Sequence, residues 1–213
     1  LDCTIKTDPA FNGGTPLVMG PDFLSSPRPS PDGRYMAWIE WDHPAMPWDA
    51  TRLRVATLLQ EGDDPPRLAA PWSAAGDDGQ VESVIEPCWD AAGRLLALSD
   101  RSGWWNLYRF DTMSSTPVAL APMKAEIGQP HWVFGLRSYV PLPDGSILAM
   151  VINDGDSRMV SIRDGMVTPV GLGHPSGCPV PLEGDGFAWL DAPPDNAAAV
   201  VRGQPGQVPQ VLR

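Results

Sequence analysis

The sequence of 213 residues has little positive charge, few cysteines and no long apolar run. A membrane-spanning helix needs roughly 20 apolar residues in succession, so we expect a soluble protein without a membrane partner. Lys and Arg number 15 against 26 Asp and Glu, for a formal net charge of -11. This balance argues against a nucleic-acid partner, because phosphate binding needs a basic face.

The three cysteines Cys3, Cys88 and Cys178 are far apart and form no Cys-x-x-Cys pair. Neither a zinc site nor a disulfide framework is indicated, and a reducing, cytoplasmic location is the simplest expectation. No metal or cofactor is expected. The chain begins with Leu1, and no charged-then-apolar signal stretch follows it, so we expect it to be cut from a longer protein.

What the sequence does contain is a pattern of short apolar runs bounded by turn residues. The 25 prolines and 21 glycines are spread along the whole chain, and long helical periodicity is missing. Such spacing is typical of an all-β protein.

An Asp-Gly type of turn followed by an apolar strand recurs about every 40 to 60 residues, which is close to the length of one propeller blade. Asp favours the start of a β-turn and glycine supplies positive φ. The four copies read "SPDGRYMAWIEW", "WDAAGRLLALSD", "LPDGSILAMVIN" and "LEGDGFAWLD".

The strand after each turn is nearly all apolar, whereas a sheet with one wet face would alternate. Burial on both faces is what the middle strands of propeller blades require. A two-sheet sandwich is the alternative, although its strands should alternate more clearly. The four strands are Tyr35–Ile39, Leu95–Leu98, Ile147–Ile152 and Phe187–Leu190.

The sequence therefore predicts one all-β domain over residues 1–213, a partial β-propeller of about four to five blades of four-stranded antiparallel sheet. Exposed end blades would leave apolar faces uncovered, so we expect a homo-oligomer or closure of the four blades on themselves. The expected units are a half blade over 1–19 and blades over 20–71, 72–122, 123–173 and 174–213.

Propeller topology places the loop between the second and third strands of each blade on one face, and the Asp-Gly turns on the other. The loop face collects residues 41–52, 100–105 and 153–158, with most of the tryptophans and unusual charges. Binding usually sits on such loops of a rigid scaffold. The candidate substrate- or interface-facing residues are Trp41, Asp42, His43, Met46, Trp48, Asp49, Arg101, Trp104, Trp105 and Arg137.

Each candidate also has a purely structural interpretation. The loop Trp41–Asp49 could be a self-packed cap, with Asp42 and Asp49 bonding the loop's own backbone, or it could line an entrance. Trp104 and Trp105 could pack blade against blade or form an aromatic shelf for a peptide.

The two candidate arginines have the same two interpretations. Arg101 and Arg137 could bind a substrate carboxylate, because guanidinium matches carboxylate in a bidentate manner. A structural pair with Asp100 or Glu126 is the favoured alternative. The run "NDGDSR" lacks the remaining ligands of a calcium loop, so a plain hairpin is expected there.

Three stretches are specific enough to indicate a family. They are "SSPRPSPDGRYMAWIEWDHPAMPWDATRLRVATL", "ESVIEPCWDAAGRLLALSDRSGWWNLYRFD" and "QPHWVFGLRSYVPLPDG". With these stretches the chain resembles the propeller of bacterial peptidases of the prolyl oligopeptidase family, close to the acylaminoacyl-peptidase and dipeptidyl-aminopeptidase branch. This resemblance implies an α/β-hydrolase catalytic domain elsewhere in the same parent chain, and short peptides as substrates.

The catalytic residues of that family have no counterpart here. No Gly-x-Ser-x-Gly elbow occurs, and Ser176 lies in "HPSGC" without the first glycine. We therefore expect a non-catalytic propeller that gates access of short peptides and is inactive alone. The alternative is a stand-alone, TolB-like propeller that binds a protein or ligand. A Gly-x-Ser-x-Gly motif encoded further along the parent gene would favour the peptidase.

Overall fold

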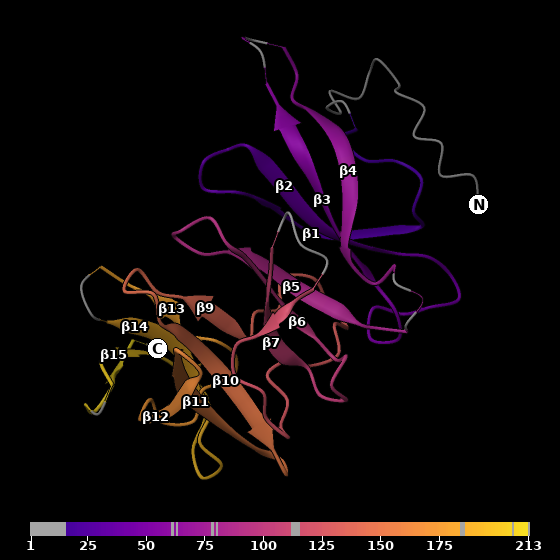
Figure 1. Cartoon of the computed structure of the whole chain (residues 1–213). Coiled ribbons are helices and arrows are strands. Elements are labelled where there is room, and N and C mark those ends of the chain that lie inside the picture. The colour runs from indigo at the N-terminus through magenta and orange to yellow at the C-terminus, as the bar shows by residue number, and fades with distance from the viewer. Residues whose placement is uncertain are drawn as a thin grey trace, which may run out of the picture.

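The structure, a computed structural model, describes residues 16–60, 62, 64–77, 79, 81–111, 116–183, 186–205 and 207–212. Within these ranges every strand belongs to one of four antiparallel four-stranded sheets, each built from four consecutive strands. The sheets follow one another in chain order, from indigo to yellow (Figure 1). The predicted partial β-propeller is confirmed. In the described ranges no helix is long and apolar enough to cross a membrane.

The first two blades carry the segments that position the site. Blade 1 consists of β1 (Phe23–Pro29), β2 (Tyr35–Trp41), β3 (Arg52–Leu59) and β4 (Arg67–Ala75), and blade 2 of β5 (Val84–Trp89), β6 (Leu95–Ser99), β7 (Asn106–Phe110) and β8 (Val118–Ala119).

The last two blades have shorter first strands. Blade 3 consists of β9 (Tyr139–Pro141), β10 (Ile147–Asn153), β11 (Asp156–Arg163) and β12 (Met166–Val170), and blade 4 of β13 (Val180–Pro181), β14 (Phe187–Asp191), β15 (Ala199–Gly203) and β16 (Gln210–Val211).

Three apolar clusters form the core, one at each contact between neighbouring blades. Strand β6 is buried along its whole length and shows why its sequence is continuously apolar. Leu95 and Ala97 belong to the cluster shared with blade 1, whereas Leu96 and Leu98 belong to the cluster shared with blade 3. Successive side chains of a strand point to opposite faces, so a middle strand between two blades needs apolar residues at every position.

The Asp-Gly turns join the first and second strands of their blades. In blade 2, Asp90 Oδ1 accepts hydrogen bonds from the backbone N–H groups of Ala92 and Arg94, and Gly93 has φ of 75°. The blade 4 turn differs, because Gly186 has no positive φ. The run "NDGDSR" is a tight hairpin in which Asn153 pairs with Asp156, so the expected plain hairpin is confirmed.

The ends of the array differ from the expectation. The predicted half blade falls mainly on residues 1–15, which lie outside the described residues, and residues 16–19 form no strand. In the described part of the chain, blades 1 and 4 lie at opposite ends of the array (Figure 1). The four blades therefore do not close on themselves, and the homo-oligomer stays a prediction.

Candidate functional site

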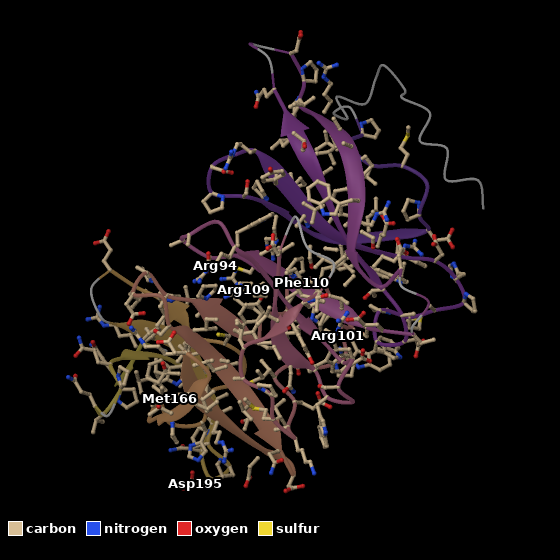
Figure 2. The ribbon with its side chains drawn as sticks, in the orientation of Figure 1. Arg94, Arg101, Arg109, Phe110, Met166 and Asp195 are labelled. Atoms are coloured by element: carbon tan, nitrogen blue, oxygen red, sulfur yellow. The ribbon has the colours of Figure 1, made fainter. Side chains whose placement is uncertain are left out.

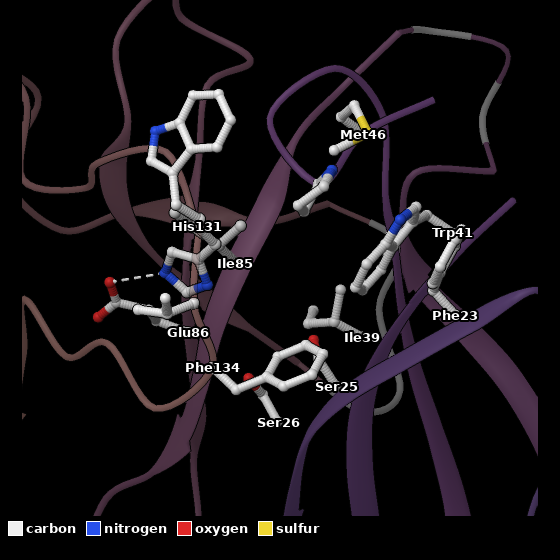
Figure 3. Close-up of a pocket in the computed structure, with 13 residues that line it drawn as sticks. Phe23, Ser25, Ser26, Ile39, Trp41, Met46, Ile85, Glu86, His131 and Phe134 are labelled. Atoms are coloured by element: carbon white, nitrogen blue, oxygen red, sulfur yellow. Dashed lines mark hydrogen bonds and ion pairs between the residues drawn. The ribbon is translucent and has the colours of Figure 1, made fainter. Parts of the chain in front are cut away.

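A cavity of about 250 Å³ opens on the loop face, between blades 1 and 2 and the segment that leads into β9. Figure 3 shows aromatic and aliphatic side chains pointing into it from both blades. We call it the apolar pocket. It is lined by Phe23, Ser25, Ser26, Ile39, Trp41, Met46, Pro47, Ile85, Glu86, His131, Trp132, Val133 and Phe134.

Two β-bulges shape the floor of the apolar pocket. Ser26 in β1 and Glu86 in β5 have positive φ, 52° and 54°, and each precedes a proline. The strand register shifts at both places. A left-handed conformation costs a residue with a Cβ about 1–2 kcal/mol, and such strain persists only where the surrounding structure enforces it. Both residues line the pocket, so the bulges bring these side chains to the site.

Glu86 ties β5 to the segment that forms the opposite wall. Its Oε2 accepts a hydrogen bond from the Ser138 backbone N–H at 2.6 Å, and its Oε1 accepts one from the Ser138 hydroxyl at 2.8 Å. His131 Nε2 lies 3.2 Å from the same Oε1 (Figure 3). Glu86 is only 6% exposed. The carboxylate therefore holds residues 131–138 in place and has little capacity left for a ligand.

The Glu86 backbone is bonded as well. Its carbonyl oxygen accepts a hydrogen bond from the Tyr139 hydroxyl at 2.7 Å. Burial raises the pKa of Tyr139 well above its usual value, so the hydroxyl remains a donor at every physiological pH. Both the side chain and the backbone of the bulge are thus attached to the start of blade 3.

Large apolar side chains stand exposed at the mouth of the apolar pocket. Trp132 and Phe134 are 75% and 76% exposed. Trp48 contacts Trp132, with ring centroids 4.2 Å apart and planes tilted by 42°. Within the pocket, Phe23 stacks on Trp41 at 5.2 Å. An apolar cavity with an aromatic rim suits an apolar or aromatic side chain of a ligand.

The loop after β2 combines the two interpretations left open by its sequence. Asp49 Oδ2 accepts a hydrogen bond from the Met46 backbone N–H within the loop, whereas Asp42 Oδ1 accepts one from the Asp22 backbone N–H outside it. His43 lies against Asp22 as well. These polar residues brace the loop, while Trp41 and Met46 line the apolar pocket and Trp48 contacts its rim.

Arg101 is a structural residue with a partner that the sequence did not suggest. Its Nε and Nη2 donate to Oε1 and Oε2 of Glu82, each at 2.9 Å, and Glu82 is 2% exposed. The predicted pairing with Asp100 or Glu126 is wrong. The β5–β6 register pairs Val84 with Ser99, which brings Glu82 beside the loop that follows β6.

The two adjacent tryptophans have different surroundings. Trp105 packs against the core cluster between blades 2 and 3, and its Nε1 donates to the Ser83 carbonyl oxygen at 3.3 Å. Its backbone N–H donates to Glu126 Oε2 at 2.6 Å. Trp104 is 39% exposed and is absent from the lining of the apolar pocket. Packing between blades therefore explains Trp105, and neither ring forms a shelf in this pocket.

Arg137 is exposed at the other end of the segment 131–137, and its guanidinium makes no hydrogen bond or ion pair within the described ranges. The predicted pairing with Asp100 or Glu126 is wrong for this arginine too. In the same ranges no group of three or more His, Cys, Asp or Glu side chains is placed to hold a metal ion.

Several residues of the apolar pocket were missed by the sequence reasoning. Glu86, His131, Trp132 and Phe134 were not among the candidates. A signal was available in the sequence. A proline interrupts the first strand of two successive blades, in "SSPR" of β1 and "IEPC" of β5, and it follows the bulged residue in each. The run "HWVF" also combines aromatic residues before a strand.

Comparison with solved structures extends this description. A Mycobacterium tuberculosis puromycin-hydrolyzing peptidase is 33% identical, with a TM-score of 0.81 over 92% of this chain and 29% of that chain. A puromycin hydrolase is 29% identical, with a TM-score of 0.74 over 89% of this chain and 29% of that one. The chain matches the propeller region of prolyl oligopeptidase family peptidases. It spans about three tenths of the length of these structures.

A more distant structure shares the fold of this propeller region. A prolyl endopeptidase structure is 16% identical, with a TM-score of 0.55 over 90% of this chain and 27% of that one. No protein-family model and no curated protein matches the chain. The apolar pocket, Glu86 and the exposed rim thus lie in a chain that is similar to the propeller region of these peptidases.

Proposed function

We propose that the chain is the non-catalytic propeller part of a serine peptidase and that it selects the short peptides which reach a catalytic domain. The apolar pocket on the loop face is the observation that carries this proposal. Loops on a rigid scaffold are common sites of binding, and this pocket opens among the longest loops of the propeller region. The match to peptidases over about nine tenths of the chain supports the same role.

The proposed contribution is binding rather than bond cleavage. An apolar or aromatic side chain of the substrate enters the pocket between Trp41 and Phe134 and excludes water there. The Glu86–Ser138 bonds hold the wall in position, so the ligand does not have to order it. The acyl transfer itself would require the nucleophile, base and orienting acid of a hydrolase domain.

The names of the similar structures suggest a substrate to test. Two of them hydrolyse puromycin, whose amide joins an aromatic amino acid to a nucleoside. We propose that aromatic aminoacyl amides and short peptides with an aromatic residue are the preferred substrates of the parent peptidase.

The experiment uses the complete product of the gene that encodes this chain. Turnover of puromycin and of chromogenic amides with aromatic or small residues is measured, with peptides of 3 to 30 residues in competition. Phe134→Ala should lower kcat/KM for aromatic substrates by about tenfold, because roughly 1.4 kcal/mol of apolar contact is lost. Small substrates should be unaffected.

Trp104→Ala is the matched control, since Trp104 is an exposed aromatic residue on the same face but outside the apolar pocket. The proposal is wrong if both variants behave alike, or if peptides of 30 residues compete as strongly as tripeptides. Peptide binding without any hydrolysis by the complete product would favour a binding module instead.

A further inference from the structure

A second cavity is lined by Gly135, Leu136 and Arg137, which follow the residues 131–134 that line the apolar pocket. It measures about 690 Å³ and lies between that segment, β10 and the start of blade 4. Arg137 is the one charged residue among the described residues that line it; Gln129, Ser157 and Ser176 are polar. An anion that entered this cavity would therefore meet a guanidinium and no carboxylate.

Arg28 from blade 1 does not line this cavity, but it shares a separate gap with Arg137. A narrow gap of about 10 Å³, room for one water at most, is lined by Arg28, Arg137, Glu86, Cys88 and Tyr139. Burial raises the pKa of Cys88, and the positive charges of Arg137 and Arg28 oppose that rise. The gap is too small for a carboxylate, so Arg28 would act on a ligand at Arg137 through its positive charge and not by contact.

Neither guanidinium is neutralised within the described ranges. Arg28 donates to the Pro27 carbonyl oxygen at 3.0 Å, and no carboxylate contacts it there. The nearby Glu86 carboxylate is already bonded to Ser138 and His131. In contrast, Arg101 and Arg94 each have a carboxylate partner. Two arginines left without carboxylates in a chain with net charge -11 form a local surplus of positive charge.

We propose that Arg137, assisted by Arg28, binds a free carboxylate of the peptide whose apolar side chain occupies the apolar pocket. Guanidinium presents paired N–H donors whose geometry matches a carboxylate. Phe134 and Arg137 are three residues apart, which limits their Cα separation to about 11 Å. A peptide of about three residues spans this distance, so a short peptide is long enough to be tested for contact with both. This inference rests on the proposed function, because both need a peptide ligand.

The test measures binding by isothermal titration of the full chain with N-acetylated Ala-Phe-Ala in three forms. These are the free acid, the C-terminal amide, and the amide of Ala-Phe-Glu, which carries its carboxylate on a side chain. The acid should bind about tenfold more tightly than the amide, as expected for hydrogen bonds to a charged group. Salt should reduce this ratio. Tight binding of the Glu amide would identify a side-chain carboxylate as a second source.

Arg137→Gln should reduce the acid-to-amide ratio to about one while leaving binding of the amide unchanged. Arg137→Lys should retain part of the ratio, because it keeps the charge and loses the paired donors. Arg109→Gln is the control. Arg109 also lacks a partner in the described ranges, but it lines a cavity at the Asp-Gly-turn end of blade 2. In Figure 2, Arg109 is labelled next to Arg94 of the Asp-Gly turn and apart from Arg101, which lies in the loop after β6.

The outcomes separate this inference from the proposed function. Equal binding of acid and amide by the unmodified chain, or an acid preference that survives in Arg137→Gln, overturns the carboxylate site while the apolar pocket stands. If Arg109→Gln also loses the preference for the acid, the effect is not specific to Arg137 and the carboxylate site is overturned. If no form binds, both proposals are wrong.

Discussion

Replacing Glu86 by alanine should lower the free energy of unfolding by about 3–4 kcal/mol. The Ser138 N–H and hydroxyl bond the Glu86 carboxylate at 2.6 and 2.8 Å, and hydrogen bonds to a charged group contribute roughly 1.5–3 kcal/mol each. The two bonds share one acceptor group, so they do not add fully. Ser138 is completely buried, and water therefore cannot replace the lost acceptor without opening the wall of the pocket.

The measurement is urea unfolding followed by tryptophan fluorescence. With a slope of about 2 kcal/mol/M, a loss of 3 kcal/mol moves the midpoint down by about 1.5 M. Asp32→Ala is the control. Asp32 also accepts hydrogen bonds from a hydroxyl and a backbone N–H, but its side chain is exposed to solvent, so its midpoint should move by much less than that of Glu86→Ala.

A second variant tests whether the charge of Glu86 matters. Glu86→Gln keeps the shape and one acceptor oxygen, and its midpoint should lie between those of the unmodified chain and Glu86→Ala. If Glu86→Ala shifts the midpoint no more than Asp32→Ala does, Glu86 does not hold the segment 131–138 and the preformed pocket wall loses its basis.

Three further predictions concern a thiol, a turn and a half-buried carboxyl. Burial raises the pKa of Cys178 to about 12, so peptide mass spectrometry should find it alkylated slowly at pH 8 and rapidly in urea; fast labelling in the folded chain would contradict this. Gly76→Ala should lower the free energy of thermal unfolding by several kcal/mol, because the added Cβ would lie 2.1 Å from the Thr51 carbonyl oxygen. Gly103→Ala is the control: Gly103 has the same φ of 85° but open space around it, so the loss should be about 1 kcal/mol. Burial raises the pKa of Asp100, so the protonated carboxyl stabilises the fold at acidic pH, and this contribution is lost as the pH rises through the folded pKa. The stability of Asp100→Asn relative to the unmodified chain should therefore increase from pH 3 to 6. A decrease over this range would refute the assignment.

The blade pattern could be deduced from the sequence because it is local. A strand such as β6, with apolar residues at every position from Leu95 to Leu98, indicates that both of its faces are covered. The turn that begins at Asp90 is held by hydrogen bonds from Ala92 and Arg94, both within the next four residues. The alternation of such strands and turns was sufficient for a partial propeller, and family-specific stretches indicated the peptidase propeller.

The site depended on contacts that no local pattern contains. Glu86 meets Ser138, 52 residues away, only because a bulge turns the Glu86 side chain toward the start of the next blade. Arg101 binds Glu82 rather than the adjacent Asp100, since strand register decides which carboxylate lies opposite a guanidinium. Composition and periodicity thus determined that blades form and stack, whereas the packing of each blade on its neighbour decided which side chains share a pocket.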